Sequence, residues 1–462
     1  MSVLVVLTVL VLGRATPLDA HDTLVRSSPA RDTSLASLPT ELRLTFSGSV
    51  TARLSRVVLL GPDSIEVALD SLRRHADSSQ VLIAPIRGQL AAGRYTVAWQ
   101  IAGADGHPVR GSFAFTILPE ALPDPIVAGA DTGAGRPLPV DDPGGEGPYD
   151  PGLPARFDSS SPLYAAIRWL YFAGILGVIG VVGFEALVLR RAVGSGLDAE
   201  TTDALRRSSA RLGLFMAGVT AASALLTLVA QTYALRVNGG FDLAVMRDAI
   251  FASQWGLGWV VGAAAVVLAG VGLLVARRSE TGWSLAALGA IGLAVSLSLA
   301  GHTATAPRLP LITMVLDALH VVAAGGWLGT LLALVVIGLP ATLALPADRR
   351  GPATAAMVNA FSPAALVFAG IALLTGLFAI GVHLGVPPAF TSTAYGRTLL
   401  VKLGAFALVV VVGAWNWRRV RPRLAEPGLP SHLRRTGTTE LLLAALVLAA
   451  TAVLVATPPP TP

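Results

Sequence analysis

Eight apolar segments dominate the last two thirds of the chain. They lie near residues 164–189, 212–235, 255–276, 283–300, 311–339, 364–386, 398–417 and 440–457. At about 1.5 Å per residue, each can cross a hydrocarbon core of about 30 Å as a helix. The composition of the 462 residues, 53% hydrophobic and 13% charged, agrees with this interpretation. The sequence therefore predicts an all-α polytopic membrane domain over residues 163–462, embedded in a lipid bilayer.

Arginines in alternate loops predict how this domain is oriented. Fifteen of them fall in one set of loops: Arg190, Arg191, Arg206, Arg207, Arg211, Arg277, Arg278, Arg349, Arg350, Arg418, Arg419, Arg421, Arg423, Arg434 and Arg435. The opposite set holds four: Arg236, Arg247, Arg308 and Arg397. Because cytoplasmic loops carry the excess of basic residues, the first set is expected in the cytoplasm. The N-terminal part and the C-terminus are then periplasmic or extracellular, and the membrane is the cytoplasmic (inner) membrane.

Charge and cysteine content exclude several classes of function. The formal net charge of +6 comes from arginines beside apolar runs, which is typical of membrane loops and argues against nucleic-acid binding. Cysteine is absent, which excludes disulfides, thiolate metal sites and iron–sulfur clusters. Any metal must therefore bind to histidine, carboxylate, methionine or backbone nitrogen.

Three different segments precede the membrane domain. Residues 1–20 have a short apolar block and end on Ala20, which is typical of a secretory signal peptide. Residues 21–118 show alternating polar and apolar residues in short strands, near 42–46, 57–60, 81–86, 95–101 and 112–117, which predicts an all-β Greek-key sandwich. Residues 119–162 are rich in Pro, Gly and Asp and are expected to form a linker.

Two histidines of the β region are candidate metal ligands. If the signal peptide is cut after Ala20, His21 begins the mature chain and offers both its α-amine and its ring nitrogen. Asp105 and His107 lie two apart, so an extended backbone directs both side chains to one side. Together they supply three nitrogens and an oxygen, a set that suits tetragonal Cu(II). Either element alone is equally typical of a polar turn or a solvated terminus.

The β region resembles the CopC family of periplasmic copper-binding β-sandwiches, whose fold is cupredoxin-like or immunoglobulin-like. The resemblance rests on HDTLVRSSPA at residues 21–30, LRLTFS at 42–47, GRYTVAW at 93–99 and ADGHPVRGSFAF at 104–115. It implies that His21, Asp105 and His107 bind Cu(II). The methionine-rich Cu(I) segment of some members has no counterpart, because no methionine occurs between residues 21 and 118.

The membrane region resembles the CopD family, and fusion of the two families in one chain is a known arrangement. The residues that carry this resemblance are GHTA at 301–304, DALHVVAAGGWLG at 317–329, FSP at 361–363 and YGRTLLVK at 395–402. The resemblance implies that the membrane domain moves copper across the membrane, classically inward.

Ionisable residues inside the apolar segments point to the same region. Asp317 and His320 are three apart and share a helix face, and charged groups at that depth usually mark a pathway. His302 and His383 fall in the same half of the membrane as His320. A buried hydrogen-bond network is the competing interpretation of Asp317 and His320. Glu185 is expected either to serve an exit step or to snorkel toward arginines, and Lys402, the only lysine, to reach the interface.

The sequence thus predicts a copper-binding transport protein and not an enzyme. Cu(II) is captured outside and copper, possibly as Cu(I), passes through the membrane histidines, with periplasmic copper carriers or a reductase as further partners. Three alternatives stay open: a periplasmic copper buffer for tolerance, a haem-binding redox protein using paired membrane histidines, and an oxidative copper enzyme, against which Asp105 argues as a third strong ligand.

Overall fold

A computed structural model describes residues 24–103, 108–121, 161–193, 197–235, 241–301, 310–383, 389–423 and 429–457. The chain divides into two compact units. The β unit consists mainly of residues 21–156, and the helical unit mainly of residues 157–462. The expected signal peptide and most of the expected linker lie outside the described residues.

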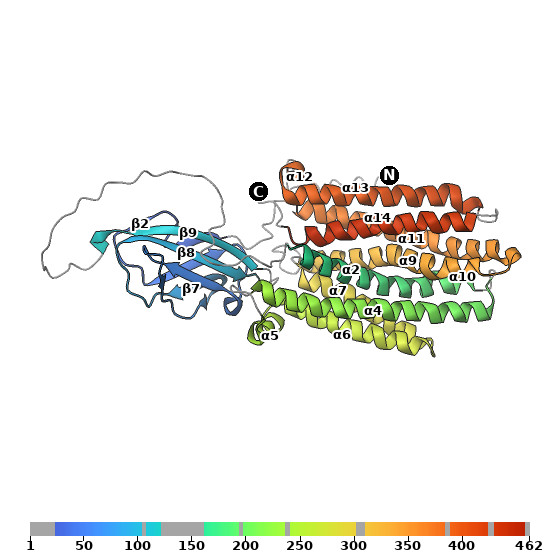
Figure 1. Cartoon of the computed structure of the whole chain (residues 1–462), viewed down its shortest axis with the longest axis horizontal. Helices are drawn as coiled ribbons and strands as arrows, with labels where there is room; N and C mark the ends of the chain where they lie inside the picture. The colour runs from blue at the N-terminus through green and yellow to red at the C-terminus, as the bar shows by residue number, and fades with distance from the viewer. Residues whose placement is uncertain are drawn as a thin grey trace. The chain divides into compact units, whose positions relative to one another are not determined.

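The β unit is an all-β sandwich of two sheets, as predicted (Figure 1). The four-stranded sheet has the order β1 (Leu24–Ser28), β3 (Glu41–Phe46), β7 (Ser78–Pro85), β6 (Arg73–His75). The five-stranded sheet has the order β2 (Ser34–Leu35), β9 (Pro108–Ile117), β8 (Gly93–Ala102), β4 (Arg56–Leu60), β5 (Glu66–Val67). Neighbouring strands are antiparallel, except that β2 runs parallel to β9. Short helical turns η1 (Ala52–Leu54) and η2 (Pro119–Ala121) lie outside the sheets.

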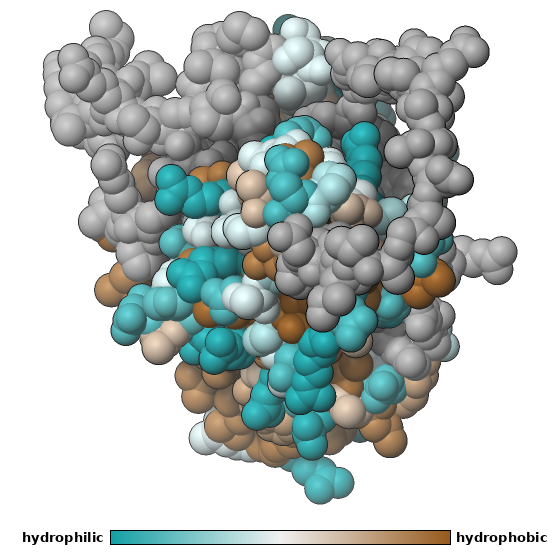
Figure 2. Space-filling model, turned by 90° about the vertical axis from the view of Figure 1, so that its left-hand side faces the viewer, coloured by the Kyte–Doolittle hydropathy of each residue, from teal (hydrophilic) through white to brown (hydrophobic). Residues whose placement is uncertain are grey.

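Alternating residues build the core between the two sheets. Leu42, Leu44 and Phe46 on β3 are at most 1% exposed, because successive side chains of a strand point to opposite faces. Phe46 packs edge-on against Trp99 of β8 with ring centroids 5.1 Å apart, which joins the sheets. Polar side chains cover much of the face of this unit seen in Figure 2.

The five strands predicted from alternation are present, and four others, β1, β2, β5 and β6, were missed. Strands β2 and β5 have two residues each, too few for a period-two pattern to be recognised. His75 ends β6, where its Nδ1 accepts a hydrogen bond of 3.2 Å from the Asp77 backbone amide.

Within the described residues, the helical unit contains eight helical spans that are long and apolar enough to cross a membrane. The first combines α2 (Pro162–Gly183), a π-helical segment η3 (Phe184–Leu189) and α3 (Arg190–Ala192). The next three are α4 (Ala199–Leu235), α6 (Gln254–Ala276) and α7 (Thr281–Ala300). The fifth runs through α8 (Pro310–Ala324), η5 (Gly325–Gly329), α9 (Thr330–Ala333), η6 (Leu334–Gly338) and α10 (Leu339–Leu343).

Three further spans complete the unit. They are α11 (Ala347–His383), α13 (Ala394–Trp415) with its π-helical continuation η7 (Asn416–Val420), and α14 (Leu429–Leu454). Short helices α5 (Leu243–Phe251), α12 (Ala389–Ser392) and η8 (Arg421–Arg423) lie between spans. The long helices run side by side along one direction (Figure 1). We call the end of the bundle that holds the arginine-rich loops the arginine-rich end.

Two helices begin earlier than hydropathy predicted. The segments expected from residues 212 and 364 start at Ala199 and Ala347, and α11 continues through Pro352 and Pro363. Their first turns are polar, so an apolar window does not detect them. Asp198 stabilises both starts, since its carboxylate accepts 2.8 Å and 3.0 Å hydrogen bonds from the Thr201 amide and from Arg349. Hydrogen bonds from Thr201, and then Arg349, lower the pKa of Asp198 to about 2.

A glycine contact holds the first and fifth spans together. A Cβ added to Gly180 on α2 would lie 1.9 Å from the carbonyl carbon of Gly329 in η5, so the backbones touch. Next to this contact the Thr330 hydroxyl donates a 3.3 Å hydrogen bond to the Gly180 carbonyl. Small residues permit such close approach between membrane helices, where van der Waals packing drives association.

We expect Gly180→Ala to destabilise the helical unit by about 1–3 kcal/mol, because a methyl group must push two backbones apart. Gly370→Ala on α11 is the matched control, since nothing lies within 4 Å of its added Cβ. Thermal unfolding of both variants in detergent measures the difference. Equal melting temperatures for the two variants would contradict the contact.

Candidate functional site

The structure describes the side chains of two of the seven predicted site residues. His21, Asp105, His107 and His302 lie outside the described residues. His383 is the last residue of α11, and its side chain is likewise outside the description. Among the described residues there is no group of three or more His, Asp or Glu side chains that could hold a metal ion. The predicted Cu(II) site therefore stays a prediction, and Asp317 and His320 are the candidates whose surroundings can be examined.

Asp317 and His320 lie on α8, seven and ten residues after its first residue, Pro310. At about 1.5 Å per residue they are about 10 and 15 Å along the helix. This places them in the half of the bundle away from the arginine-rich end. Both side chains are half-buried, and they share one face of α8.

His320 is held by the sixth span. Its Nδ1 lies 2.9 Å from the hydroxyl oxygen of Thr375 on α11. That hydroxyl already donates its single proton to the Ile371 carbonyl, at 2.7 Å. With that proton donated, the hydroxyl would accept from the imidazole, which is the tautomer with the proton on Nδ1 of His320. This assignment leaves Nε2 as an unprotonated nitrogen, the form that binds a metal.

Asp317 brings two more spans to the same place. The buried Ser298 hydroxyl on α7 interacts with its carboxylate. The ammonium group of Lys402 on α13 interacts electrostatically with Asp317 and with His320. Helices α7, α8, α11 and α13 therefore converge on one polar cluster, defined by Ser298, Asp317, His320, Thr375 and Lys402.

Lys402 differs from the expectation for it. It is half-buried in the bundle, where its ammonium group interacts electrostatically with the Asp317 carboxylate. The physical reason is that an ammonium group within an apolar bundle is stabilised most by a nearby carboxylate. Its being the only lysine of the chain was a signal for this role. Ser298 and Thr375 had no such signal in the sequence, because hydroxyl side chains are common in membrane helices and usually hydrogen-bond to the backbone of their own helix.

Glu185 forms a second charged cluster near the arginine-rich end. Its side chain is 1% exposed, so it does not snorkel, and its carboxylate lies 3.2 Å from Arg206 and 3.6 Å from Arg190. Both arginines also pair with Glu280, at 3.0 and 2.8 Å. Glu185 has two cationic partners and belongs to an ion-pair network. This argues against its carboxylate serving as a copper ligand at an exit step.

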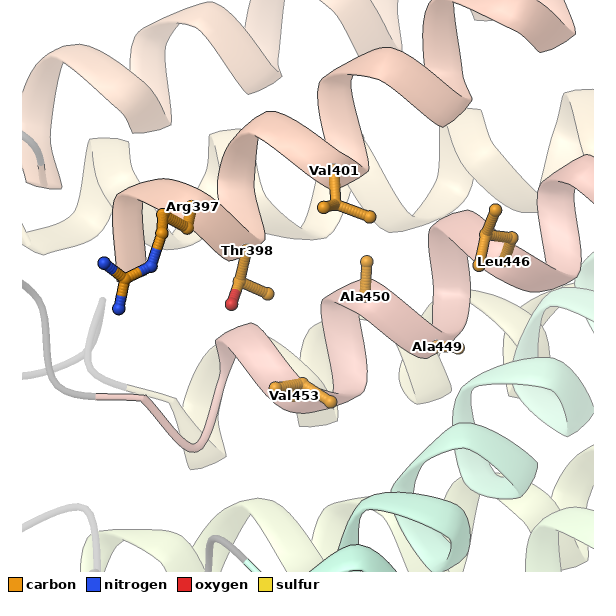
Figure 3. Close-up of a pocket in the computed structure, with 7 residues that line it drawn as sticks. All are labelled: Arg397, Thr398, Val401, Leu446, Ala449, Ala450 and Val453. Atoms are coloured by element: carbon orange, nitrogen blue, oxygen red, sulfur yellow. The ribbon is translucent and has the colours of Figure 1, made fainter. Parts of the chain in front are cut away.

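A shallow groove of about 370 Å³ lies between α13 and α14 (Figure 3). It is lined by Arg397, Thr398, Val401, Leu446, Ala449, Ala450 and Val453. Since this lining has neither an imidazole nor a carboxylate, the groove is not a candidate metal site.

Comparison with known proteins identifies the parts of the chain. Family models match it in three places: CopC domain over residues 24–118, Copper resistance protein D-like, N-terminal domain over 159–307, and Copper resistance protein D over 355–454. The chain belongs to the CopC/CopD fusion family. Copper binding with transport or resistance is the function that this CopC/CopD membership supports. The two family models that match the helical unit leave residues 308–354 unmatched, so these matches say nothing about Asp317 and His320.

Individual relatives cover both the whole chain and the CopC part. The CopC/CopD chain is 27% identical over 440 residues to the Copper transport protein CutJ of Bacillus subtilis (strain 168), covering 92% of this chain and 71% of that protein. It is 31% identical over 115 residues to Copper resistance protein C of Escherichia coli, covering 23% of this chain and 90% of that protein. The crystal structure of CopC from Methylosinus trichosporium OB3b is 30% identical, covers 21% of this chain and 95% of its own, and has a TM-score of 0.20.

We expect Lys402→Met to lower the melting temperature of the CopC/CopD chain, because it leaves Asp317 without a cation. Adding Asp317→Asn should recover much of the loss, with an interaction free energy of about 0.5–3 kcal/mol in the double-mutant cycle. Thermal unfolding in detergent measures all four proteins. Arg397→Met, at an exposed position of the same helix, is the control. Additive effects of the two substitutions would show that Asp317 and Lys402 do not interact.

Proposed function

We propose that this chain captures Cu(II) outside the cytoplasmic membrane and passes copper to its helical unit for import. Capture uses the α-amine and imidazole of His21 together with Asp105 and His107. Three nitrogens and one carboxylate oxygen match the tetragonal preference of Cu(II). The β unit, with its CopC match, supports a copper-binding role for this part of the chain.

The observation that carries the membrane step is the polar cluster around His320. Its imidazole is fixed by Thr375 through Nδ1, which leaves Nε2 to bind copper, and Asp317 lies one turn away on the same face. An outer hydrogen-bond partner of this kind orients a metal-binding histidine. His302 and His383 belong to the same half of the membrane in the predicted topology and would complete the path.

Lys402 gives this cluster a means of staying neutral without copper. Its ammonium group supplies the positive charge that balances Asp317 when no metal is present. Entry of a copper ion brings a competing positive charge, so copper and the ammonium group repel each other. Lys402 would thereby limit how long copper stays at Asp317 and His320, which suits a transfer site better than a storage site.

We expect His21→Ala or His107→Ala to abolish the Cu(II) electron paramagnetic resonance signal of a tightly bound, nitrogen-ligated site in the purified full-length chain. Removing one imidazole from a set of four ligands breaks the tetragonal site. His75→Ala is the matched control, since His75 belongs to the β unit but not to the proposed site. An unchanged spectrum in both variants would reject these ligands.

We expect His320→Ala to reduce copper accumulation by cells to the level of cells lacking the protein. Thr375→Val should lower the copper affinity of the site by about 10–100-fold and so reduce accumulation only partially. His432→Ala is the control, because His432 is exposed at the arginine-rich end of α14. Full accumulation with His320→Ala would remove His320 from the path. Greater copper sensitivity of cells lacking the protein, without a change in accumulation, would favour a buffering role for tolerance.

A further inference from the structure

A second carboxyl group is buried in the half of the bundle near the arginine-rich end, and copper transport as proposed does not use it. Glu440 lies on α14 and is 5% exposed. Its Oε1 accepts a hydrogen bond from the side-chain amide of Asn416, the first residue of η7. Asn416 is 8% exposed, so the pair is enclosed between the seventh and eighth spans. Neither residue was singled out from the sequence.

Glu440 differs from Glu185, the other carboxyl group that is fully buried in the described part of the chain. Glu185 has two arginine partners, whereas the interaction recorded for Glu440 is with the neutral amide of Asn416. An isolated carboxylate in an apolar interior costs several kcal/mol, and it avoids this cost by taking up a proton.

The elements packed against α14 supply no cationic partner for Glu440 among the described residues. The segments α9, η6 and α10 contain no ionisable residue. Arg418 and Arg419 of η7 are exposed, and Glu185 is bound in its own ion pairs. The other ionisable residues of α2, α3, α11, α13 and α14 are Arg168, Arg190, Arg191, Asp348, Arg349, Arg350, His383, Tyr164, Tyr171, Tyr395, Arg397, Lys402, His432, Arg434 and Arg435. Among the described residues, none of them forms an ion pair with Glu440, whose surroundings are set by burial and by the Asn416 hydrogen bond.

Asn416 has an unsatisfied acceptor at the same place. Its side-chain Oδ1 is buried and has no hydrogen-bond partner among the described residues. A buried amide oxygen without a donor costs about 1–3 kcal/mol. The second carboxyl oxygen of Glu440, Oε2, faces α13, where a Cβ on Gly413 would lie 3.6 Å from it. A proton on Oε2 would turn this oxygen into the donor that Oδ1 lacks.

We propose that Glu440 and Asn416 form a proton-binding site within the membrane-spanning unit. In the loaded state Oε2–H donates to Oδ1 of Asn416 while the Asn416 amide donates to Oε1, which gives a cyclic acid–amide pair with both groups satisfied. Release of the proton leaves a carboxylate held by the one amide donor. The oxygen-only ligand set favours a proton over a soft copper ion.

The position of this site suggests what the proton is for. Glu440 and Asn416 lie toward the arginine-rich end, whereas Asp317 and His320 lie in the opposite half. A proton released from this site in the direction opposite to copper movement would offset the positive charge that the copper ion carries across the unit. This coupling rests on the proposed copper import, whereas the proton site itself does not.

Infrared spectroscopy of the full-length chain in detergent tests the site directly. We expect the wild-type protein to show the carbonyl band of a buried protonated carboxylic acid at neutral pH, shifted by deuterium exchange. Glu440→Gln, which keeps the neutral pairing with Asn416, should lose this band. Glu200→Gln is the control, because Glu200 is exposed at the start of α4 and should leave the band unchanged. A Glu440→Gln spectrum that keeps the band overturns the proposal.

The same variants separate this proposal from the proposed function. If copper uptake depends on pH in the wild type and the dependence disappears in Glu440→Gln, proton and copper movement are coupled. If no protein, including the wild type, takes up copper but the band is still lost in Glu440→Gln, the proton site stands and copper import fails. Asn416→Leu provides a second readout, because removing both hydrogen bonds should shift the band to higher frequency, and an unshifted band counts against the pairing.

Discussion

An ionisable side chain inside a low-dielectric helical bundle must find a partner, and the helical unit is organised around this constraint. Asp317 has Ser298 and Lys402, His320 has Thr375, and Glu185 has two arginines. All of these pairings except Glu185 with Arg190 connect different spans. The polar cluster joins α7, α8, α11 and α13, and the Glu185 network joins the first span to α4 and to Glu280, next to α7. Apolar packing, such as the Gly180 contact, brings the helices together without fixing which polar groups meet.

The two halves of the bundle therefore have different chemistry. The half away from the arginine-rich end holds the His320 imidazole, the Asp317 carboxylate and the Lys402 ammonium group, which interact with one another electrostatically. The other half holds ion pairs around Glu185 and the hydrogen-bonded pair of Glu440 with Asn416. A copper ion would meet nitrogen and oxygen ligands first and only carboxyl and amide groups later, so the two halves can act on different cations.

Much of the architecture could be predicted from the sequence because two periodicities are strong. Alternation predicted five of the strands, and apolar length predicted the eight spans. The two-residue strands and the polar first turns of α4 and α11 have no such pattern. Asp317 and His320 could be chosen because ionisable residues are rare in apolar segments. Their partners could not, since Thr375, Ser298 and Asn416 look like ordinary membrane-helix residues until packing brings them together. Glu440 was overlooked because it is the first residue of an apolar segment, where a carboxylate is expected to lie at the membrane interface.

The central claim is that copper crosses the membrane inward through this chain. Uptake of isotopic copper into sealed vesicles with the β unit facing outward tests it most directly, with the same vesicles lacking the protein as the reference. Import predicts that copper accumulates inside only when the protein is present and that His320→Ala removes the difference. Equal accumulation with and without the protein would contradict the claim.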